Sequence, residues 1–261
     1  VLFSGWGSSR SVLDPFARTL AAEGVVVATV DSGAPDEILE GEYECSQRLA
    51  VLSAWDSGAD PAAPVAVGGH SMGAGLALMA SVFDPFISLT TGGPLDCGLE
   101  SEDALPPVDL VIGLGGAWAP AECDMLPGVE GLTAMVADGF PAYVHPYDGN
   151  PSVPILMAHG TADGACPIEA TRAAAEAFEA DGHPVELLVF EGQGHSGGML
   201  FLDPGDDPDA PADTDAAEGR EVVAAIVRDL SPAESEAGPG EAASAATGVD
   251  IITDLEATDV G

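Results

Sequence analysis

Short apolar segments alternate with helix-length segments along most of this chain, and this alternation limits the folds that it can adopt. The apolar segments are rich in β-branched residues and lack alternating polar positions, as in VVVATV (25–30) and PVAVGG (64–69). Strands that are apolar on both sides must be covered on both faces, as in a parallel sheet with helices on either side. The sequence therefore predicts an α/β fold built on a mainly parallel sheet.

The expected elements fill residues 1–230, which we interpret as one domain. Strands are predicted at 1–4, 25–30, 64–69, 108–114, 153–160 and 184–190, and helices at 14–24, 36–57, 72–83, 167–181 and 216–229. In the first helix Asp14 is expected to be the cap, Pro15 suits the first turn, and Gly24 suits the end.

Two segments depart from the alternation. Residues 119–152 hold Pro, Gly and two Tyr between apolar patches, which predicts a cap or a long active-site loop, or else an ordinary surface insertion. Residues 231–261 contain few large apolar residues and are expected to form an acidic, mobile tail. Val1 already has the character of a strand interior, so we expect further residues upstream of it.

The charge balance restricts the partners of the protein. Its 261 residues include 44 acidic and 6 basic side chains, which gives a net charge of −38. This charge argues against nucleic acid, whose phosphates are bound by Lys and Arg, and no apolar run reaches the roughly 18 residues of a membrane span. Such acidity is typical of proteins in salty media, where salt screens self-repulsion, or of secreted proteins. We expect a secreted or periplasmic location, or alternatively the cytoplasm of a salt-adapted organism.

The four cysteines and the acidic run at 203–215 are the residues that could form disulfides or bind a metal ion. Cys45, Cys97, Cys123 and Cys166 are compatible with one or two disulfides in an oxidising compartment, or with buried free thiols. They form no C-x-x-C pair, so no zinc site is predicted. The acidic run at 203–215 lacks the spacing of a calcium-binding loop and is interpreted as a solvated loop. No metal or cofactor is therefore predicted.

GHSMG (69–73) matches G-x-S-x-G and lies between a predicted strand and a predicted helix. A serine in this position sits in a sharp, strained turn with its hydroxyl exposed, and the flanking glycines leave room for the backbone. The turn also places Ser71 at a helix N-terminus, where the N–H of Met72 is available to an oxyanion. Ser71 is therefore a candidate nucleophile.

Two residues that could activate this serine follow later strands. Asp163 lies in the loop after the strand at 153–160, and His195 lies in a glycine-rich loop after the strand at 184–190. The carboxyl ends of parallel strands meet at one edge of the sheet, so we expect both side chains near Ser71. Asp138 and Asp148 are rivals of Asp163, but neither directly follows a strand pattern.

The other histidines have simpler interpretations. His70 is expected to pack against or support the turn around the serine. His159 is expected to hydrogen-bond loop backbone, and His145 and His183 are expected at the surface or in loops.

With these motifs the chain resembles the α/β-hydrolase superfamily over roughly residues 1–230. The patterns HGTAD…P (159–167) and GQGHS (192–196) are similar to those of the dienelactone hydrolase and prolyl-oligopeptidase-like esterases. The resemblance implies Ser71 as nucleophile, His195 as general base and then acid, and Asp163 as the residue that orients His195. It also implies N-terminal strands before residue 1 that are missing from this sequence.

A second oxyanion donor is implied by the same resemblance. The family pattern His-Gly-x after the first strand corresponds to SGW (4–6), so Trp6 is the expected donor and Ser4 replaces the family's histidine. Cutinase-like polyester hydrolases are also similar, through their G-H-S-M-G turn, an aromatic residue at the oxyanion position and a Trp after the next strand. Trp118 would then contact substrate, or else simply cap the core.

The expected function is hydrolysis of small-molecule or polymeric carboxylic esters without a cofactor. Ser71 would attack the ester carbonyl, and the oxyanion would lie between the N–H groups of Met72 and Trp6. Three other enzyme classes are alternatives: a cutinase-like polyester hydrolase, a peptidase and a thioesterase. A non-catalytic binding protein with the same fold is an alternative from another class.

Overall fold

A computed structural model describes residues 1–5, 8–31, 60, 62–82, 108–118, 153–201 and 216–231. The strands are β1 (Leu2–Phe3), β2 (Thr29–Val30), β3 (Ala66–His70), β4 (Leu110–Leu114), β5 (Ile155–Gly160) and β6 (Val185–Phe190). The helices are α1 (Asp14–Ala22), α3 (Met72–Val82), α5 (Ile168–Ala180) and α6 (Ala217–Leu230), with short 3-10 helices η1 (Arg10–Leu13) and η3 (Gly197–Leu200).

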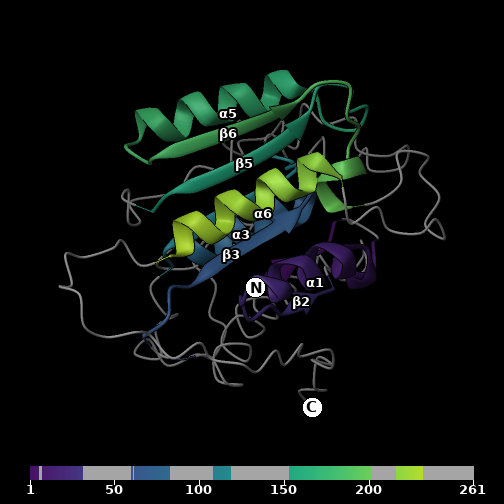
Figure 1. The fold of residues 1–261 in the computed structure, drawn as a ribbon. Helices are drawn as coiled ribbons and strands as arrows, with labels where there is room; N and C mark the ends of the chain where they lie inside the picture. Colours follow the sequence, from purple (N-terminus) through teal and green to yellow (C-terminus); the bar gives the residue numbers. More distant parts are fainter. Residues whose placement is uncertain are drawn as a thin grey trace, which may run out of the picture.

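The strands form one six-stranded sheet in the order β2-β1-β3-β4-β5-β6 (Figure 1). Every neighbouring pair is parallel, so all six carboxyl ends lie at one edge. The predicted α/β fold with a parallel sheet is therefore confirmed.

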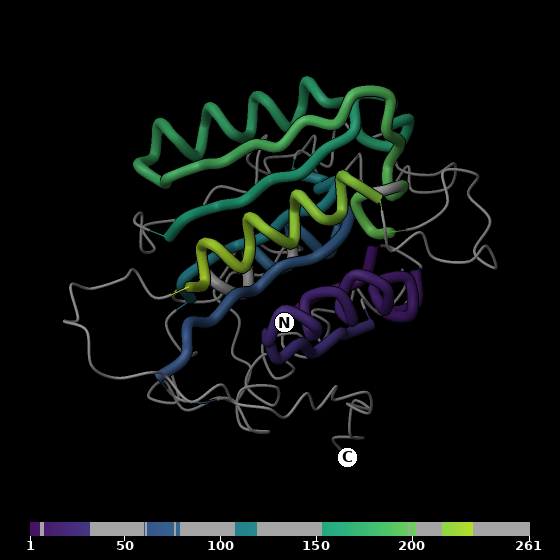
Figure 2. The backbone as a smooth tube through the Cα atoms, in the orientation of Figure 1, coloured from purple at the N-terminus to yellow at the C-terminus, as the bar shows by residue number. Residues whose placement is uncertain are grey.

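Helices cover both faces of the sheet because the strand side chains alternate between two cores. Leu110, Ile112 and Leu114 of β4 pack in one core with apolar residues of α1 and α6, whereas Val111 packs in the other with residues of α3 and α5. Figure 2 shows α1 and α6 together on the side of the sheet that faces the viewer. Burial on both faces explains the continuously apolar strand sequences.

The start of α1 differs from the prediction, because Asp14 is not its cap. The 3-10 helix η1 runs directly into α1, and the backbone N–H of Asp14 donates to the carbonyl of Ser11. The chain is already helical at this point, so the capping role passes to Ser9, whose hydroxyl accepts from the Ser11 N–H at 3.3 Å. Pro15 lies in the first turn of α1, as predicted.

The second strand is much shorter than the apolar run at 25–30. Gly24, with φ +90°, follows the helix as predicted, but only Thr29 and Val30 pair with β1. The short β1 offers only two residues for pairing, so the preceding valines lie outside the sheet, and Val26 is 56% exposed. The other described strands and helices agree with their predicted ranges to within a few residues.

Several predictions fall outside the described residues. These are the helix at 36–57, the insertion at 119–152, the acidic run at 203–215, the tail beyond Ser231, and Cys45, Cys97 and Cys123. Cys166 is buried and disulfide-bonded, so for this cysteine the disulfide alternative holds.

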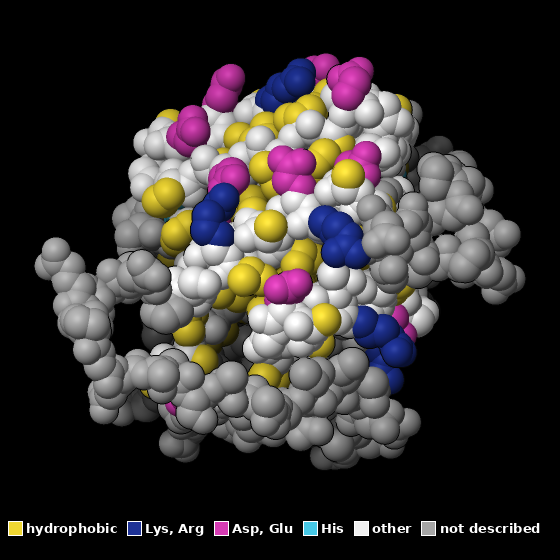
Figure 3. All heavy atoms as spheres, viewed as in Figure 1, with side chains coloured by type: hydrophobic (Ala, Val, Ile, Leu, Met, Phe, Trp, Pro, Cys, Tyr) yellow, Lys and Arg dark blue, Asp and Glu magenta, His cyan; other side chains and the backbone are white. Residues whose placement is uncertain are grey.

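The described surface carries the acidic character of the sequence. On the face in Figure 3, arginine side chains lie apart from one another among Asp and Glu, without a basic patch. Arg228, for example, forms ion pairs with Glu186 and Asp229. Within the described ranges, no helix combines the length and apolar character needed to cross a membrane.

Candidate active site

The turn between β3 and α3 holds Ser71 in a strained conformation. Ser71 has φ 55°, in the left-handed region that costs a residue with a side chain about 1–3 kcal/mol. Close backbone approach explains the flanking glycines: a Cβ on Gly69 would lie 2.4 Å from the backbone of Gly73, and one on Gly73 would lie 2.3 Å from the carbonyl oxygen of Ser4. The strained turn is therefore built around residue 71, as the motif predicts.

Ser71 is held at the carboxyl edge of the sheet by its own backbone. Its N–H donates to the carbonyl of Leu114 at 2.9 Å, and its carbonyl accepts from the N–H of Ala117 at 3.0 Å. These bonds fasten the serine to the end of β4, while the residue itself is only 7% exposed.

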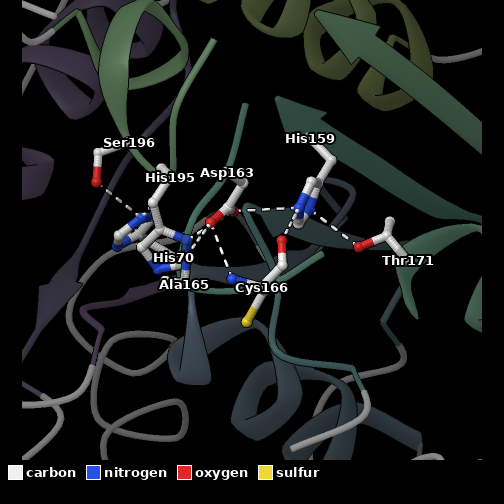
Figure 4. A network of polar contacts seen from close by, with 8 residues as sticks. All are labelled: His70, His159, Asp163, Ala165, Cys166, Thr171, His195 and Ser196. Atoms are coloured by element: carbon white, nitrogen blue, oxygen red, sulfur yellow. Dashed lines mark hydrogen bonds and ion pairs between the residues drawn. The ribbon is translucent and has the colours of Figure 1, made fainter. Parts of the chain in front are cut away.

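Asp163 and His195 lie in contact, although they come from loops after different strands. The Nδ1–H of His195 donates to Oδ2 of Asp163 at 2.7 Å (Figure 4). The other carboxylate oxygen, Oδ1, accepts from the backbone N–H groups of Ala165 at 2.8 Å and Cys166 at 2.9 Å. The predicted pairing of these two side chains is therefore present in the structure.

The carboxylate of Asp163 is kept ionised by these donors. Its burial would raise its pKa, but hydrogen bonds from His159, His195 and the N–H of Cys166 outweigh that effect and hold the pKa of Asp163 well below its usual range. Because the pKa of Asp163 is lowered in the folded state, its ionised carboxylate stabilises the fold at pH values above the ordinary pKa of 3.8. This stabilisation is lost as the pH falls below 3.8 into strong acid.

The His195 loop lies next to the strand end that holds Ser71. Gly115, with φ +54°, directly follows Leu114, and a Cβ there would lie 2.5 Å from the carbonyl oxygen of His195 and 3.5 Å from its Nδ1. Within the described part of the chain, no hydrogen bond joins Ser71 to His195 directly. The structure thus brings Asp163 and His195 into contact and holds Ser71, which follows β3, against the end of β4, next to the His195 loop.

His70 links the serine turn to the His195 loop. Its Nε2–H donates to the carbonyl of His195 at 3.1 Å, Ser196 Oγ lies 3.1 Å from the same nitrogen, and the His70 and His195 ring centroids are 4.8 Å apart. Burial, reinforced by the neighbouring His195, lowers the pKa of His70 to about 4. The expectation that His70 supports the turn agrees with these contacts.

The lowered pKa of His70 predicts a loss of stability in mild acid. As the pH falls from 6.5, the ordinary pKa, towards 4, the unfolded chain binds a proton that the folded chain resists. This difference corresponds to roughly 3 kcal/mol of unfolding free energy, fully present above pH 6.5 and lost in that window. Urea unfolding of wild type and His70→Gln at pH 7 and pH 4 isolates it, because the carboxylates titrate in both proteins. Equal acid losses in the two proteins would contradict the assignment.

Of the two expected oxyanion donors, only Met72 lies among the described residues. Met72 is the first residue of α3, so its N–H has no partner within the helix. Trp6 lies outside the described residues, but the segment leading to it begins beside the serine: a Cβ on Gly5 would lie 3.1 Å from the Cβ of Ser71. Ser4, at the position of the family's histidine, is buried and donates its hydroxyl proton to the carbonyl of Ser8 at 2.8 Å.

Trp118 is placed in the core. Its side chain is 0% exposed and packs edge-on against Phe178 of α5, with ring centroids 5.7 Å apart. This position agrees with the alternative that Trp118 caps the core, whereas its contact with substrate stays a prediction.

The sequence reasoning missed the full role of His159. Its Nε2 lies 2.9 Å from the carbonyl oxygen of Cys166, as the expected backbone contact requires, but also 3.1 Å from Oδ2 of Asp163. Figure 4 shows His159 and His195 approaching this carboxylate from opposite sides. The signal available in the sequence was the short spacing from His159 to Asp163 across one strand-to-loop junction.

Comparison with known proteins gives a match to one family model and matches to solved structures. A model of the prolyl oligopeptidase family matches residues 140–200, which include Asp163 and His195. A search of curated proteins gave no significant match.

Solved structures of an esterase share the fold. The thermophilic esterase Est2 of Thermogutta terrifontis with propionate bound is 20% identical, with a TM-score of 0.57, and the alignment covers 88% of this chain and 80% of that one. The same esterase phosphonylated by sarin has a TM-score of 0.55 at 20% identity, covering 86% and 80%. Acyl-protein thioesterase 2 of Zea mays has a TM-score of 0.47 at 19% identity, covering 88% and 92%.

Proposed function

We propose that this chain, which shares its fold with solved esterase structures and matches the prolyl oligopeptidase family over residues 140–200, is a serine hydrolase that cleaves carboxylic esters. The observation that carries the proposal is the hydrogen-bonded pair of His195 and Asp163, together with a serine held at φ 55° at the end of β3, next to the end of β4 against which the His195 loop lies. A buried carboxylate, an imidazole and a strained serine are the parts that nucleophilic acyl transfer requires.

The proposed reaction proceeds in two stages. His195 accepts the proton of Ser71 as the hydroxyl attacks the ester carbonyl, and Asp163 holds Nδ1 protonated so that Nε2 is the basic nitrogen. The oxyanion is stabilised by the N–H of Met72 and, in our proposal, by that of Trp6. The alcohol leaves with the proton from His195, and water then hydrolyses the acyl-enzyme by the same route.

Small esters are the proposed substrates. The esterase of T. terrifontis, which shares the fold, has been solved with propionate bound and in a form phosphonylated by sarin. Those ligands suggest short acyl esters and organophosphorus reagents as probes for this chain. A secreted or periplasmic location, or alternatively the cytoplasm of a salt-adapted organism, is compatible with the acidic composition and is part of the same proposal.

A fluorophosphonate probe followed by a substrate panel tests the proposal. We expect covalent capture of the wild-type protein at the peptide that contains Ser71, and no capture of Ser71→Ala. Turnover of p-nitrophenyl esters should exceed that of matched thioesters, peptide anilides and a polyester film. An unlabelled wild-type protein would instead indicate a non-catalytic binding protein, and faster turnover of another substrate class would replace the ester assignment.

A further inference from the structure

A single carboxylate oxygen lies between two imidazoles. Oδ2 of Asp163 is 2.7 Å from Nδ1 of His195 and 3.1 Å from Nε2 of His159. The side chains of Asp163 and His159 are both fully buried, whereas that of His195 is 24% exposed. The proposed mechanism uses only the exposed imidazole, so the role of the buried one has to be explained.

The surroundings of His159 determine which of its nitrogens carries the proton. Nε2 faces the carbonyl oxygen of Cys166 and the carboxylate of Asp163, both of which can only accept hydrogen bonds. Nε2 must therefore carry the proton. Nδ1 lies 2.9 Å from the hydroxyl of Thr171, which can donate to it. The Nε2–H tautomer satisfies every one of these contacts.

Thr171 connects this arrangement to a rigid element. It is buried, 1% exposed, and lies in the first turns of α5, which packs on β5 and β6. His159 itself is in β5, so the imidazole is fixed at its Cα by the sheet and at its far side by a helix. By contrast, Asp163 and its two backbone donors lie in the loop between β5 and α5.

We propose that His159 is a positioning residue that holds the carboxylate of Asp163 in the orientation that His195 needs. The inference rests on the proposed function, because it assigns the buried partner of the same site. The Nε2–H of His159 fixes Oδ2 from the side of the core, while the N–H groups of Ala165 and Cys166 fix Oδ1. The carboxylate then cannot rotate away when His195 becomes an imidazolium, and a donor already bound to Oδ2 opposes transfer of the imidazolium proton to Asp163.

Nitrogen-15 NMR of histidine-labelled protein tests the geometry without reference to activity. The chain has five histidines, so the tautomers can be assigned by single substitutions. We expect His159 to be protonated at Nε2, and the Nδ1–H of His195 to resonate far downfield because it is bound to a carboxylate. His159→Leu should shift or broaden that His195 resonance, and His159→Gln, which keeps an N–H donor, should restore part of it.

Kinetics with p-nitrophenyl butyrate give the second readout. We expect His159→Leu to lower kcat on the order of 10- to 100-fold with little change in KM, since misplacing a catalytic group affects the transition state more than binding. Thr171→Val, which replaces the hydroxyl by a methyl group, should also lower kcat but by less, whereas Thr171→Ser, which keeps the hydroxyl, should leave kcat close to that of the wild type. The Thr171 pair decides the question if His159→Leu does not fold.

His183→Gln is the matched control. His183 is also buried and hydrogen-bonded through Nδ1 to a carbonyl, that of Val153, but it precedes β6 at the opposite end of the sheet. It should lower stability without moving kcat or the His195 resonance. Unchanged kcat and an unmoved resonance in both His159→Leu and Thr171→Val would overturn the inference. If the wild type hydrolyses no ester, the proposed function fails, while the resonance still reports whether His159 positions Asp163.

Discussion

Replacement of Ser71 by alanine is expected to lower ester hydrolysis by about 10⁴-fold or more, leaving only the residual effect of the oxyanion donors and of binding. The hydroxyl is the only group that can form the acyl-enzyme in the proposed reaction. The geometry around it is set by the backbone, through the bonds to Leu114 and Ala117, so alanine should leave the turn in place. The loss should therefore lie in kcat and not in folding.

Initial rates on p-nitrophenyl butyrate, with thermal melts of both proteins, measure this effect. Ser231→Ala is a suitable control, because Ser231 lies at the exposed end of α6 and its hydroxyl only donates to the carbonyl of Val227. Its rate should equal that of the wild type. Hydrolysis by Ser71→Ala at the parental rate would exclude Ser71 as the nucleophile.

The placement of the candidate catalytic residues could be predicted because it follows from the sheet. Ser71 comes directly after a strand, and Asp163 and His195 lie in loops that follow strands, each strand being identified by its apolar sequence. The carboxyl ends of parallel strands meet at one edge. The sheet alone predicts that these residues share an edge, whereas the 2.7 Å contact between His195 and Asp163 also depends on the paths of their loops.

Contacts that depend on loop paths could not be predicted in this way. The sequence indicated a backbone partner for His159 but not that the loop at 161–167 folds back and places Asp163 against the same nitrogen. The 3-10 helix before α1 could not be predicted for a similar reason. Asp14 and Pro15 are typical residues for a helix start, and they do not show whether the preceding residues are already helical. Strand length was overestimated at 25–30, where the limit is set by the partner strand β1.

Asp163→Asn is the second substitution for which a loss of about 10⁴-fold is expected, although it changes one atom. In the wild type, Oδ1 accepts from two backbone N–H groups, so the asparagine carbonyl should take that position. The amide NH₂ then faces Nδ1 of His195, where the carboxylate Oδ2 lay. An amide donor forces Nδ1 to accept, which moves the imidazole proton to Nε2. Nε2 can then no longer take the proton of Ser71.

A control variant is needed to show that the loss comes from the orientation of His195 by Asp163 and not from the removal of an acidic side chain in general. Asp109→Asn is a matched control: Asp109 accepts from the N–H of Val65 at 2.8 Å, at the opposite end of the sheet, and its change should leave the rate intact. The tautomer of His195 in Asp163→Asn, read from nitrogen-15 shifts, should be Nε2–H, in contrast to the wild type. A variant that keeps the Nδ1–H tautomer and most of the activity would show that another acid, such as Asp138 or Asp148, orients the imidazole. Because a tautomer is set by the nearest acceptor, the rate and the spectrum should change together.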